Sequence, residues 1–159
     1  KKLIPVANAN NVRAKMIGER SRFPEDIQKG IAELEESTMA NTGMLFSFAV
    51  NYGGRDEMIR AIRRIALESS PSELSEKLSH LTEEEFSNYL DTAGTPDPDL
   101  VIRTSGEFRT SNFLLWQSAY AELYFTETHW PDFTPEELKR AIEDFAGRSR
   151  RFGGLTTEE

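Results

Sequence analysis

The feature that most limits the possible folds is residues 44–50, MLFSFAV, which are apolar at every position except one serine. A strand of this kind has no polar face to turn toward water, so both of its faces need cover. That requirement is typical of parallel sheets, where helices pack on both sides. A second strand is predicted over residues 11–19, because apolar and basic side chains alternate there as in a strand with one buried face.

Helices are predicted between the strands, and the alternation sets the fold class. Apolar residues recur at helical spacing over 23–34, and residues 51–67 turn and enter another helix. Short apolar runs at 99–103 and 121–127 indicate a third and a fourth strand. Later helices are expected to begin at capping boxes, which are Ser70/Glu73, Thr82/Glu85 and Thr134/Glu137. We therefore predict an α/β fold, with a central, mostly parallel sheet flanked by helices.

Composition narrows the class of protein. The 159 residues suffice for one domain, which we expect to cover 1–154, with 155–159 as a disordered tail. A net charge of −8 argues against a general binder of nucleic acid or of membrane surfaces, which needs a basic face. The lack of cysteine excludes disulfides and is compatible with a reducing compartment, so we expect a cytoplasmic protein. No apolar run is long enough to predict a transmembrane segment.

The stretch RTSGEFRTSNF, residues 103–113, gathers groups that seek anions at the end of a predicted strand. Ligands of open α/β sheets bind beyond the carboxyl ends of the strands, which is where Arg103 falls. The planar forks of Arg103 and Arg109, the Ser111 hydroxyl and the amides of a helix start could hold a diphosphate. The alternative is a common loop, in which the arginines pair with acidic neighbours and the serine caps the next helix.

Two further positions have a functional and a structural interpretation. Glu122 begins a predicted strand among apolar residues, where its carboxylate could bind Mg²⁺, but spacing alone favours a salt bridge to a nearby arginine. The segment RSRRFGG, residues 148–154, could close the last helix by complementing its dipole. In the functional reading, Arg151 and the amide of Gly153 contact a second anion. The two histidines have no partner at metal-ligand spacing and receive no role.

Longer stretches of the chain resemble a known family. The segment DPDLVIRTSGEFRTSNFLLWQSAYAELYFTETHWPDF is similar to the C-terminal signature of the cis-prenyltransferases. NVRAKMIGERSRFP, FAVNYGGRDEM and RSRRFGG resemble the same family, in the expected order. The resemblance implies the condensation of isopentenyl diphosphate with an allylic diphosphate such as farnesyl diphosphate. Each cycle would add one cis isoprene unit with Mg²⁺ as cofactor, toward a long-chain product such as undecaprenyl diphosphate.

The resemblance also implies roles for particular residues. The positions that match the family's site for the diphosphate of isopentenyl diphosphate are Arg103, Arg109 and Ser111, and Thr110 between them is expected to offer its backbone amide. Glu122 matches the family's metal-associated glutamate. The family is dimeric, so a homodimer is implied, in which Arg151 and Gly153 reach the isopentenyl site across the interface. No nucleic acid is implied as a partner, and peripheral association with a membrane stays open because the product partitions into lipid.

The chain departs from the family pattern in two respects. Phe108 stands where many bacterial members carry a polar residue, often a histidine linked to the metal, so no metal role is carried over to it. The family's N-terminal His-x-x-Met-Asp-Gly-Asn motif, which holds the catalytic aspartate, is not in this chain. The sequence therefore resembles the C-terminal two-thirds of a synthase, and these residues alone are expected to be inactive. A non-catalytic accessory subunit of a heteromeric cis-prenyltransferase is the alternative.

Overall fold

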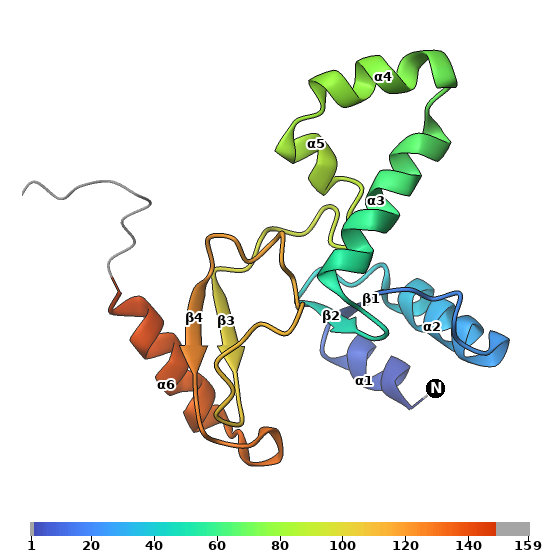
Figure 1. Ribbon diagram of the computed structural model, residues 1–159. Helices are drawn as coiled ribbons and strands as arrows, with labels where there is room; N and C mark the ends of the chain where they lie inside the picture. Colours follow the sequence, from blue (N-terminus) through green and yellow to red (C-terminus); the bar gives the residue numbers. More distant parts are fainter. Residues whose placement is uncertain (1, 149–159) are drawn as a thin grey trace, which may run out of the picture. The chain divides into compact units, whose positions relative to one another are not determined.

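The computed structural model describes residues 2–148, and the chain divides into two compact units, Lys1–Thr95 and Pro96–Glu159 (Figure 1). Each unit contains one pair of parallel strands and is considered by itself. The strands are parallel and the elements alternate as the sequence predicts, so the α/β class is confirmed. A single domain over residues 1–154 stays a prediction.

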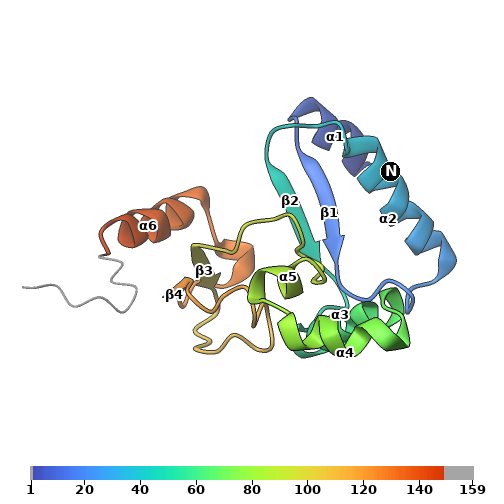
Figure 2. The same cartoon turned by 90° about the horizontal axis from the view of Figure 1, so that it is seen from above.

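Unit 1 is built around the strands β1 and β2, with α2 packed beside β1 (Figure 2). The two strands pair in register, so that Ala14 lies opposite Phe46 and Met16 opposite Phe48. The first four elements are α1 (Leu3–Ala9), β1 (Arg13–Ile17), α2 (Glu25–Thr38) and β2 (Leu45–Ala49). They are followed by α3 (Gly54–Glu68), α4 (Pro71–His80) and α5 (Glu83–Ser87).

The outer edge of β1 is closed by side chains of α2. The amide of Ala14 donates to the buried Thr38 hydroxyl over 3.0 Å, and the amide of Met16 donates to Glu35 Oε1 over 2.8 Å. Unpaired strand amides invite another strand, so these two bonds end the sheet on this side. Within residues 2–148, no comparable side-chain bond closes the free edge of β2, and Phe46 on this strand is 53% exposed, although the sequence predicts a strand buried on both faces. Any further strand of this sheet would therefore be expected beside β2.

The predicted helix starts are observed. Ser70 and Thr82 precede α4 and α5 with complete capping boxes, and the Thr134 hydroxyl accepts a bond from the Glu137 amide at the start of α6. A sharp turn follows β1 at Gly18, whose φ is +122°. A Cβ at this position would collide with the carbonyl oxygen of Val50. Only glycine therefore fits where the chain leaves the strand.

Unit 2 contains β3 (Leu100–Arg103), β4 (Glu122–Phe125), the short 3₁₀ helix η1 (Trp130–Asp132) and α6 (Pro135–Ala146). Leu100 lies opposite Glu122 and Arg103 opposite Phe125. Residues 104–121 form turns, and the helix start expected near Ser111 is absent. Ser111, Asn112 and Leu114 instead have left-handed backbone angles, with φ of 50°, 66° and 45°. Such angles interrupt a right-handed helix, which explains why none forms.

The helices of residues 2–148 are also informative about membranes. None of them combines the length and the apolar character that crossing a bilayer requires.

Candidate functional site

A cleft of about 400 Å³ opens in unit 2 beside the carboxyl end of β3. Its floor comes from one face of the strand pair, because Val101 pairs with Leu123 and Arg103 with Phe125. Aromatic rings add to the lining, with Trp130 stacked on Phe133 at a centroid distance of 6.0 Å. The cleft therefore has an apolar floor, and charged groups lie at one end of the cleft.

The charged groups are the arginines that the sequence singled out. Arg103 and Arg109 both line the cleft, together with Thr110 and Glu107. Arg109 is ion-paired with Glu107, whereas the half-buried Arg103 has no ion-pair partner within residues 2–148. The ion pair of Arg109 agrees with the alternative that this stretch is a common loop whose arginines pair with acidic neighbours. That alternative does not explain why both arginines line one cleft. An uncompensated guanidinium over an apolar floor is suited to an anionic ligand with an apolar body.

Backbone hydrogen bonds fix the loop that carries Arg109. The amides of Ser105 and Gly106 donate to the carbonyl oxygens of Thr128 and Thr126, each over 2.9 Å. Gly106 has a φ of 65°, a left-handed conformation that suits glycine and turns the chain back toward the cleft. These bonds tie the loop to the segment that follows β4, and both arginines line the same cleft.

Other residues near the loop lie less directly on the cleft. Ser111 is exposed and is not part of the cleft lining, although Thr110 beside it is. Phe108 is 75% exposed, and its ring lies 5.2 Å from that of Phe125. The phenylalanine thus extends the apolar surface at a position where the family resemblance leads one to expect a polar side chain.

Glu122 lies at the other end of the strand pair from Arg103. Glu122 pairs with Leu100, and Leu100 lies three residues before Arg103. Glu122 and Arg103 are therefore separated by about 10 Å along the strand direction. Glu122 Oε2 accepts a 2.9 Å bond from Arg148 Nη1, and the carboxylate does not line the cleft. This is the salt bridge that spacing alone favoured.

A Mg²⁺ site is not assembled by the described residues. Within 2–148, no group of three or more acidic or histidine side chains converges as metal ligands. Glu122 has an arginine as its neighbour, and a guanidinium excludes a second cation by charge repulsion. Glu122 is engaged by Arg148 in this structure, and its role as a metal ligand stays a prediction. Arg151 and Gly153, predicted to reach across a dimer, lie outside the described residues.

Sequence reasoning missed several residues of the cleft. No functional role was predicted for the aromatic residues of this region, yet Phe113, Trp130 and Phe133 line the cleft, and Trp130 is 73% exposed. The available signal was the position of Trp130 in a turn just after β4, where ligands of parallel sheets gather. Glu107 was also missed, although it stands between the two arginines in the sequence.

Unit 1 has an apolar groove of about 630 Å³ on the β1–β2 pair and the adjoining helices. Phe46 and Phe48 of β2 form one side, and Leu3 and Val6 of α1 contribute to another. Met44 lies at the entrance to β2 and is largely exposed. The groove contains almost no polar atoms, so it is suited to a hydrocarbon chain rather than to a charged group.

Comparison with known proteins gives consistent matches. Residues 1–153 match the Prenyltransf family model, which describes undecaprenyl diphosphate synthase. An isoprenyl transferase from Rhizobium meliloti is 55% identical over 146 residues, which cover 92% of this chain and 58% of that protein. One from Geobacter sulfurreducens is 49% identical over 151 residues, covering 95% of this chain and 61% of that protein. The chain thus spans about three fifths of the length of these relatives.

Solved structures resemble the chain as well. A probable undecaprenyl diphosphate synthase from Campylobacter jejuni has a TM-score of 0.81 at 39% identity, over 96% of this chain and 68% of that one. Lavandulyl diphosphate synthase from Lavandula x intermedia, solved with dimethylallyl diphosphate, has a TM-score of 0.85 at 36% identity. That match covers 95% of this chain and 64% of the lavender enzyme.

Proposed function

Because the chain belongs to the Prenyltransf family of undecaprenyl diphosphate synthases, we propose that it carries the isopentenyl diphosphate half-site of a cis-prenyltransferase. The protein would condense isopentenyl diphosphate with an allylic diphosphate, farnesyl diphosphate or longer, to a long-chain polyprenyl diphosphate. The observation that carries the proposal is the cleft of unit 2, in which Arg103 and Arg109 stand at the edge of an apolar floor. Isopentenyl diphosphate has the same division into a charged head and an apolar body.

The arginines would bind the diphosphate of isopentenyl diphosphate. Each guanidinium can donate two parallel hydrogen bonds to phosphate oxygens, and it stays charged at any working pH. Arg103 brings a charge that no carboxylate of the described part of the chain neutralises, while Arg109 would be shared between Glu107 and the ligand. Thr110 would offer its amide, and Ser111 its hydroxyl after a small movement of the exposed loop.

In the reaction, the terminal alkene carbon of isopentenyl diphosphate forms a bond to the allylic carbon, and the allylic diphosphate leaves with the bonding electrons. A proton is then lost from the isopentenyl unit, which restores a double bond. The residues of unit 2 would contribute by fixing the alkene in position, since orientation supplies much of the rate. Leu123, Phe125 and Phe133 would exclude water from the carbocation-like centre.

Mg²⁺ is proposed as the cofactor on the basis of family membership alone. When bound, the ion would neutralise charge on the departing diphosphate. Glu122 remains a candidate ligand only if Arg148 moves away, and no step above depends on it.

The apolar groove of unit 1 is proposed to hold the growing prenyl chain. Its lining by Phe46, Phe48, Leu3 and Val6 supports this role, because each added isoprene unit needs further apolar surface. Met44 lines the same groove, so its side chain would influence how long a prenyl chain the groove holds.

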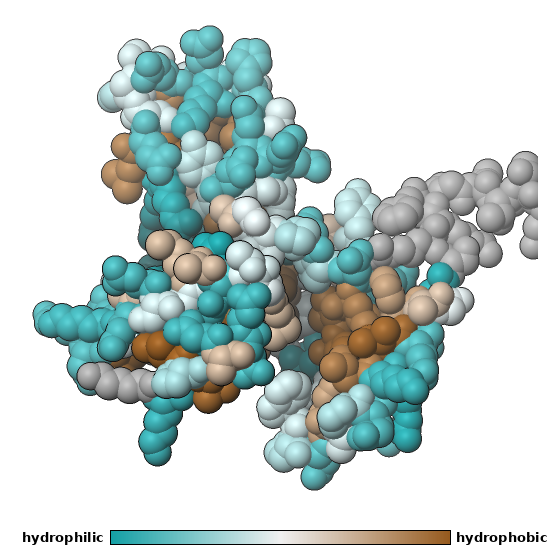
Figure 3. All heavy atoms as spheres, turned by 180° about the vertical axis from the view of Figure 1, so that it is seen from behind, coloured by the Kyte–Doolittle hydropathy of each residue, from teal (hydrophilic) through white to brown (hydrophobic). Residues whose placement is uncertain are grey.

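We propose that the protein forms a homodimer, because unit 2 exposes apolar surface. Large apolar side chains of unit 2 are exposed, and Figure 3 shows hydrophobic area, in brown, on this unit. Exposed apolar patches of this kind mark interaction surfaces. Arg151 and Gly153 are proposed to complete the isopentenyl site of the partner subunit. We also propose a cytoplasmic location, with access to the membrane that would receive the product.

The test is prenyl transfer by the chain together with any residues that precede it in the natural protein. Radiolabelled isopentenyl diphosphate and farnesyl diphosphate should give a long-chain product with cis double bonds in the presence of Mg²⁺. Arg103→Ala should raise the KM for isopentenyl diphosphate far more than that for farnesyl diphosphate. A protein that makes no product alone, but stimulates a second synthase chain, would instead be the accessory subunit.

A further inference from the structure

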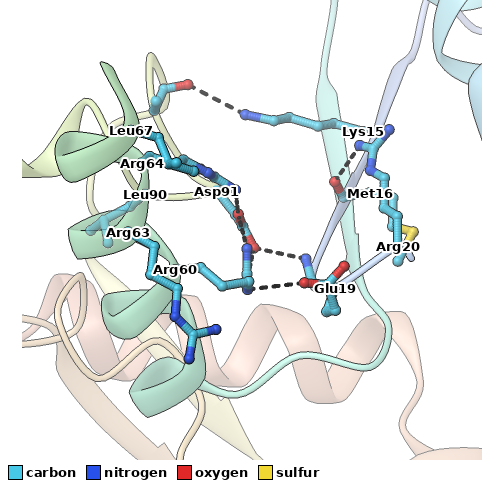
Figure 4. A pocket seen from close by; sticks show the side chains of 12 residues that line it. Lys15, Met16, Glu19, Arg20, Arg60, Arg63, Arg64, Leu67, Leu90 and Asp91 are labelled. Atoms are coloured by element: carbon cyan, nitrogen blue, oxygen red, sulfur yellow. Dashed lines mark hydrogen bonds and ion pairs between the residues drawn. The ribbon is translucent and has the colours of Figure 1, made fainter. Parts of the chain in front are cut away.

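A second charged cleft lies wholly within unit 1 and has a volume of about 560 Å³ (Figure 4). Five cationic side chains and two carboxylates line it, in a chain whose net charge is −8. The charged residues are Lys15, Arg20, Arg60, Arg63 and Arg64 with Glu19 and Asp91. Such a local excess of positive charge in an acidic protein needs an explanation of its own.

Asp91 holds part of this cluster rigidly. Its two carboxylate oxygens accept bonds of 2.7 and 2.6 Å from the fork of Arg60, and one of them accepts a 2.9 Å bond from Arg64. The amide of Gly18, just after β1, donates to the same carboxylate over 2.9 Å. The Asp91 side chain is 8% exposed, so these groups are fixed in place. Asp91 accordingly positions two arginines of α3 against the end of β1.

The carboxylates leave part of the positive charge unbalanced. One Asp91 serves both Arg60 and Arg64, and Arg20 is paired with Glu35 over 2.6 Å. Arg60 uses three of its five N–H groups, on Asp91 and Asp56, so donors remain available. The ion-paired Arg60 thus still has N–H groups that could donate hydrogen bonds to a ligand.

Two cations have no carboxylate partner within residues 2–148. Lys15 reaches across the cleft to the carbonyl oxygen of Ala93 over 3.3 Å, and no dashed line joins Arg63 to another group in Figure 4. Burial lowers the pKa of Lys15, with Arg13 acting in the same direction and Asp91 opposing it. A half-buried ammonium without a counter-ion is unfavourable, and an anionic ligand would relieve that cost.

The position of the cleft is also that of a ligand site. Met16, Gly18 and Arg20 belong to the end of β1 or follow it directly, and parallel sheets bind ligands beyond the carboxyl ends of their strands. Leu67 stands at the cleft with 86% of its surface exposed. A purely structural ion-pair cluster would explain Arg60 and Asp91, but not Lys15 and Arg63, which have no carboxylate partner among residues 2–148.

We propose that this cleft binds a phosphate or diphosphate group, with Lys15 and Arg63 as its direct cationic contacts and Asp91 as the positioning residue for Arg60 and Arg64. The group could be free diphosphate, which the proposed reaction releases, or the phosphate of a lipid headgroup at a membrane surface. The chemistry recognised is the same, and the experiment separates the two sources. The site shares no lining residue with the cleft of Arg103 and Arg109.

The test measures binding of inorganic diphosphate by calorimetry, without metal, to the chain with any residues that precede it naturally. The starting variant carries Arg103→Ala and Arg109→Ala, so that the cleft of unit 2 does not contribute. Adding Lys15→Met and Arg63→Met should weaken the remaining binding at least about tenfold, because two charge-assisted contacts are lost. If that variant fails to fold, as judged by circular dichroism, Arg63→Gln alone should weaken binding in the same direction.

The matched control adds Lys29→Met and Lys139→Met to the same starting variant. Both lysines are more than 70% exposed, so the net charge changes equally while the cleft is untouched. A second arm measures flotation with vesicles of phosphatidylcholine with and without phosphatidylglycerol. Loss of diphosphate binding alone identifies a free ligand, and loss of anionic-vesicle binding alone identifies a lipid headgroup. If the cleft variant and the control behave alike with both probes, the proposal is overturned.

Discussion

Replacing Arg103 by alanine tests the cleft of unit 2 most directly. Its guanidinium has no ion pair within residues 2–148, so the substitution leaves no buried carboxylate without a partner. The loss therefore reports the ligand contact alone. A hydrogen bond to a charged group contributes about 1.5–3 kcal/mol, and each 1.4 kcal/mol corresponds to about tenfold in affinity. Counting the fork as one such contact, isopentenyl diphosphate should bind roughly 10- to 150-fold more weakly.

The assay is calorimetric titration with isopentenyl diphosphate in the absence of an allylic substrate. Arg103→Lys keeps the charge but loses the two parallel bonds, so its affinity should fall between wild type and alanine. Arg140→Ala, an exposed arginine of the same unit, serves as the control for net charge. An affinity for isopentenyl diphosphate that matches this control would refute the assignment of Arg103.

Four further outcomes are expected. In urea unfolding of the chain with any residues that precede it naturally, Asp91→Asn should cost up to about 3–5 kcal/mol, because the nearly buried Arg60 keeps only Asp56 as a hydrogen-bonded carboxylate partner. Burial is the largest single influence and would raise the pKa of Asp91, but the hydrogen bonds from Arg60, Arg64 and the Gly18 amide, with the charge of Arg60, together lower the pKa below its ordinary value. The stabilisation is therefore complete above about pH 5, where the unfolded carboxyl is ionised, and it is lost as the pH falls through the lowered pKa of the folded state; Asp91→Asn should abolish this pH dependence. Gly18→Ala should cost more than about 1–3 kcal/mol in the same assay, because the collision of its Cβ with the Val50 carbonyl oxygen adds to the strain of the left-handed backbone. Glu122→Gln should change stability by at most about 1 kcal/mol, since its ion pair is partly exposed, so a large loss of turnover would report function. The 159 residues alone should aggregate and show no prenyl transfer, because Phe46 and its neighbours on β2 are uncovered, and turnover like that of a longer relative would contradict this.

Local features of the chain were predictable because they depend on near neighbours in the sequence. The parallel strands at 13–17 and 45–49 follow from their side-chain patterns, and the helix starts after Ser70, Thr82 and Thr134 follow from capping chemistry. Arg103 was placed at the end of a strand by the same reasoning. What failed locally was the helix expected near Ser111, since nothing in the composition of that stretch indicates left-handed backbone angles.

Contacts between distant residues could not be predicted in this way. Several arginines follow or precede Glu122, and only packing selects Arg148, which lies 26 residues away, as its partner. Asp91 meets Arg60 across 31 residues, and no periodicity relates the two positions. Such pairings depend on the turns that place distant segments of the chain next to each other, and many combinations of turns are compatible with the same sequence pattern.

The order of strands and helices, the position of an arginine at the end of β3 and the membership of a family were thus set by the amino-acid sequence itself. The tertiary structure decided which charges face a cleft and which neutralise one another. Arg103 and Arg109 line one cleft with an apolar floor, and Glu122 is ion-paired with Arg148. Lys15 and Arg63 line another cleft and have no carboxylate partner among residues 2–148. The physical reason is that an ion pair needs two groups within a few ångströms, and that distance is set by the fold rather than by separation along the chain.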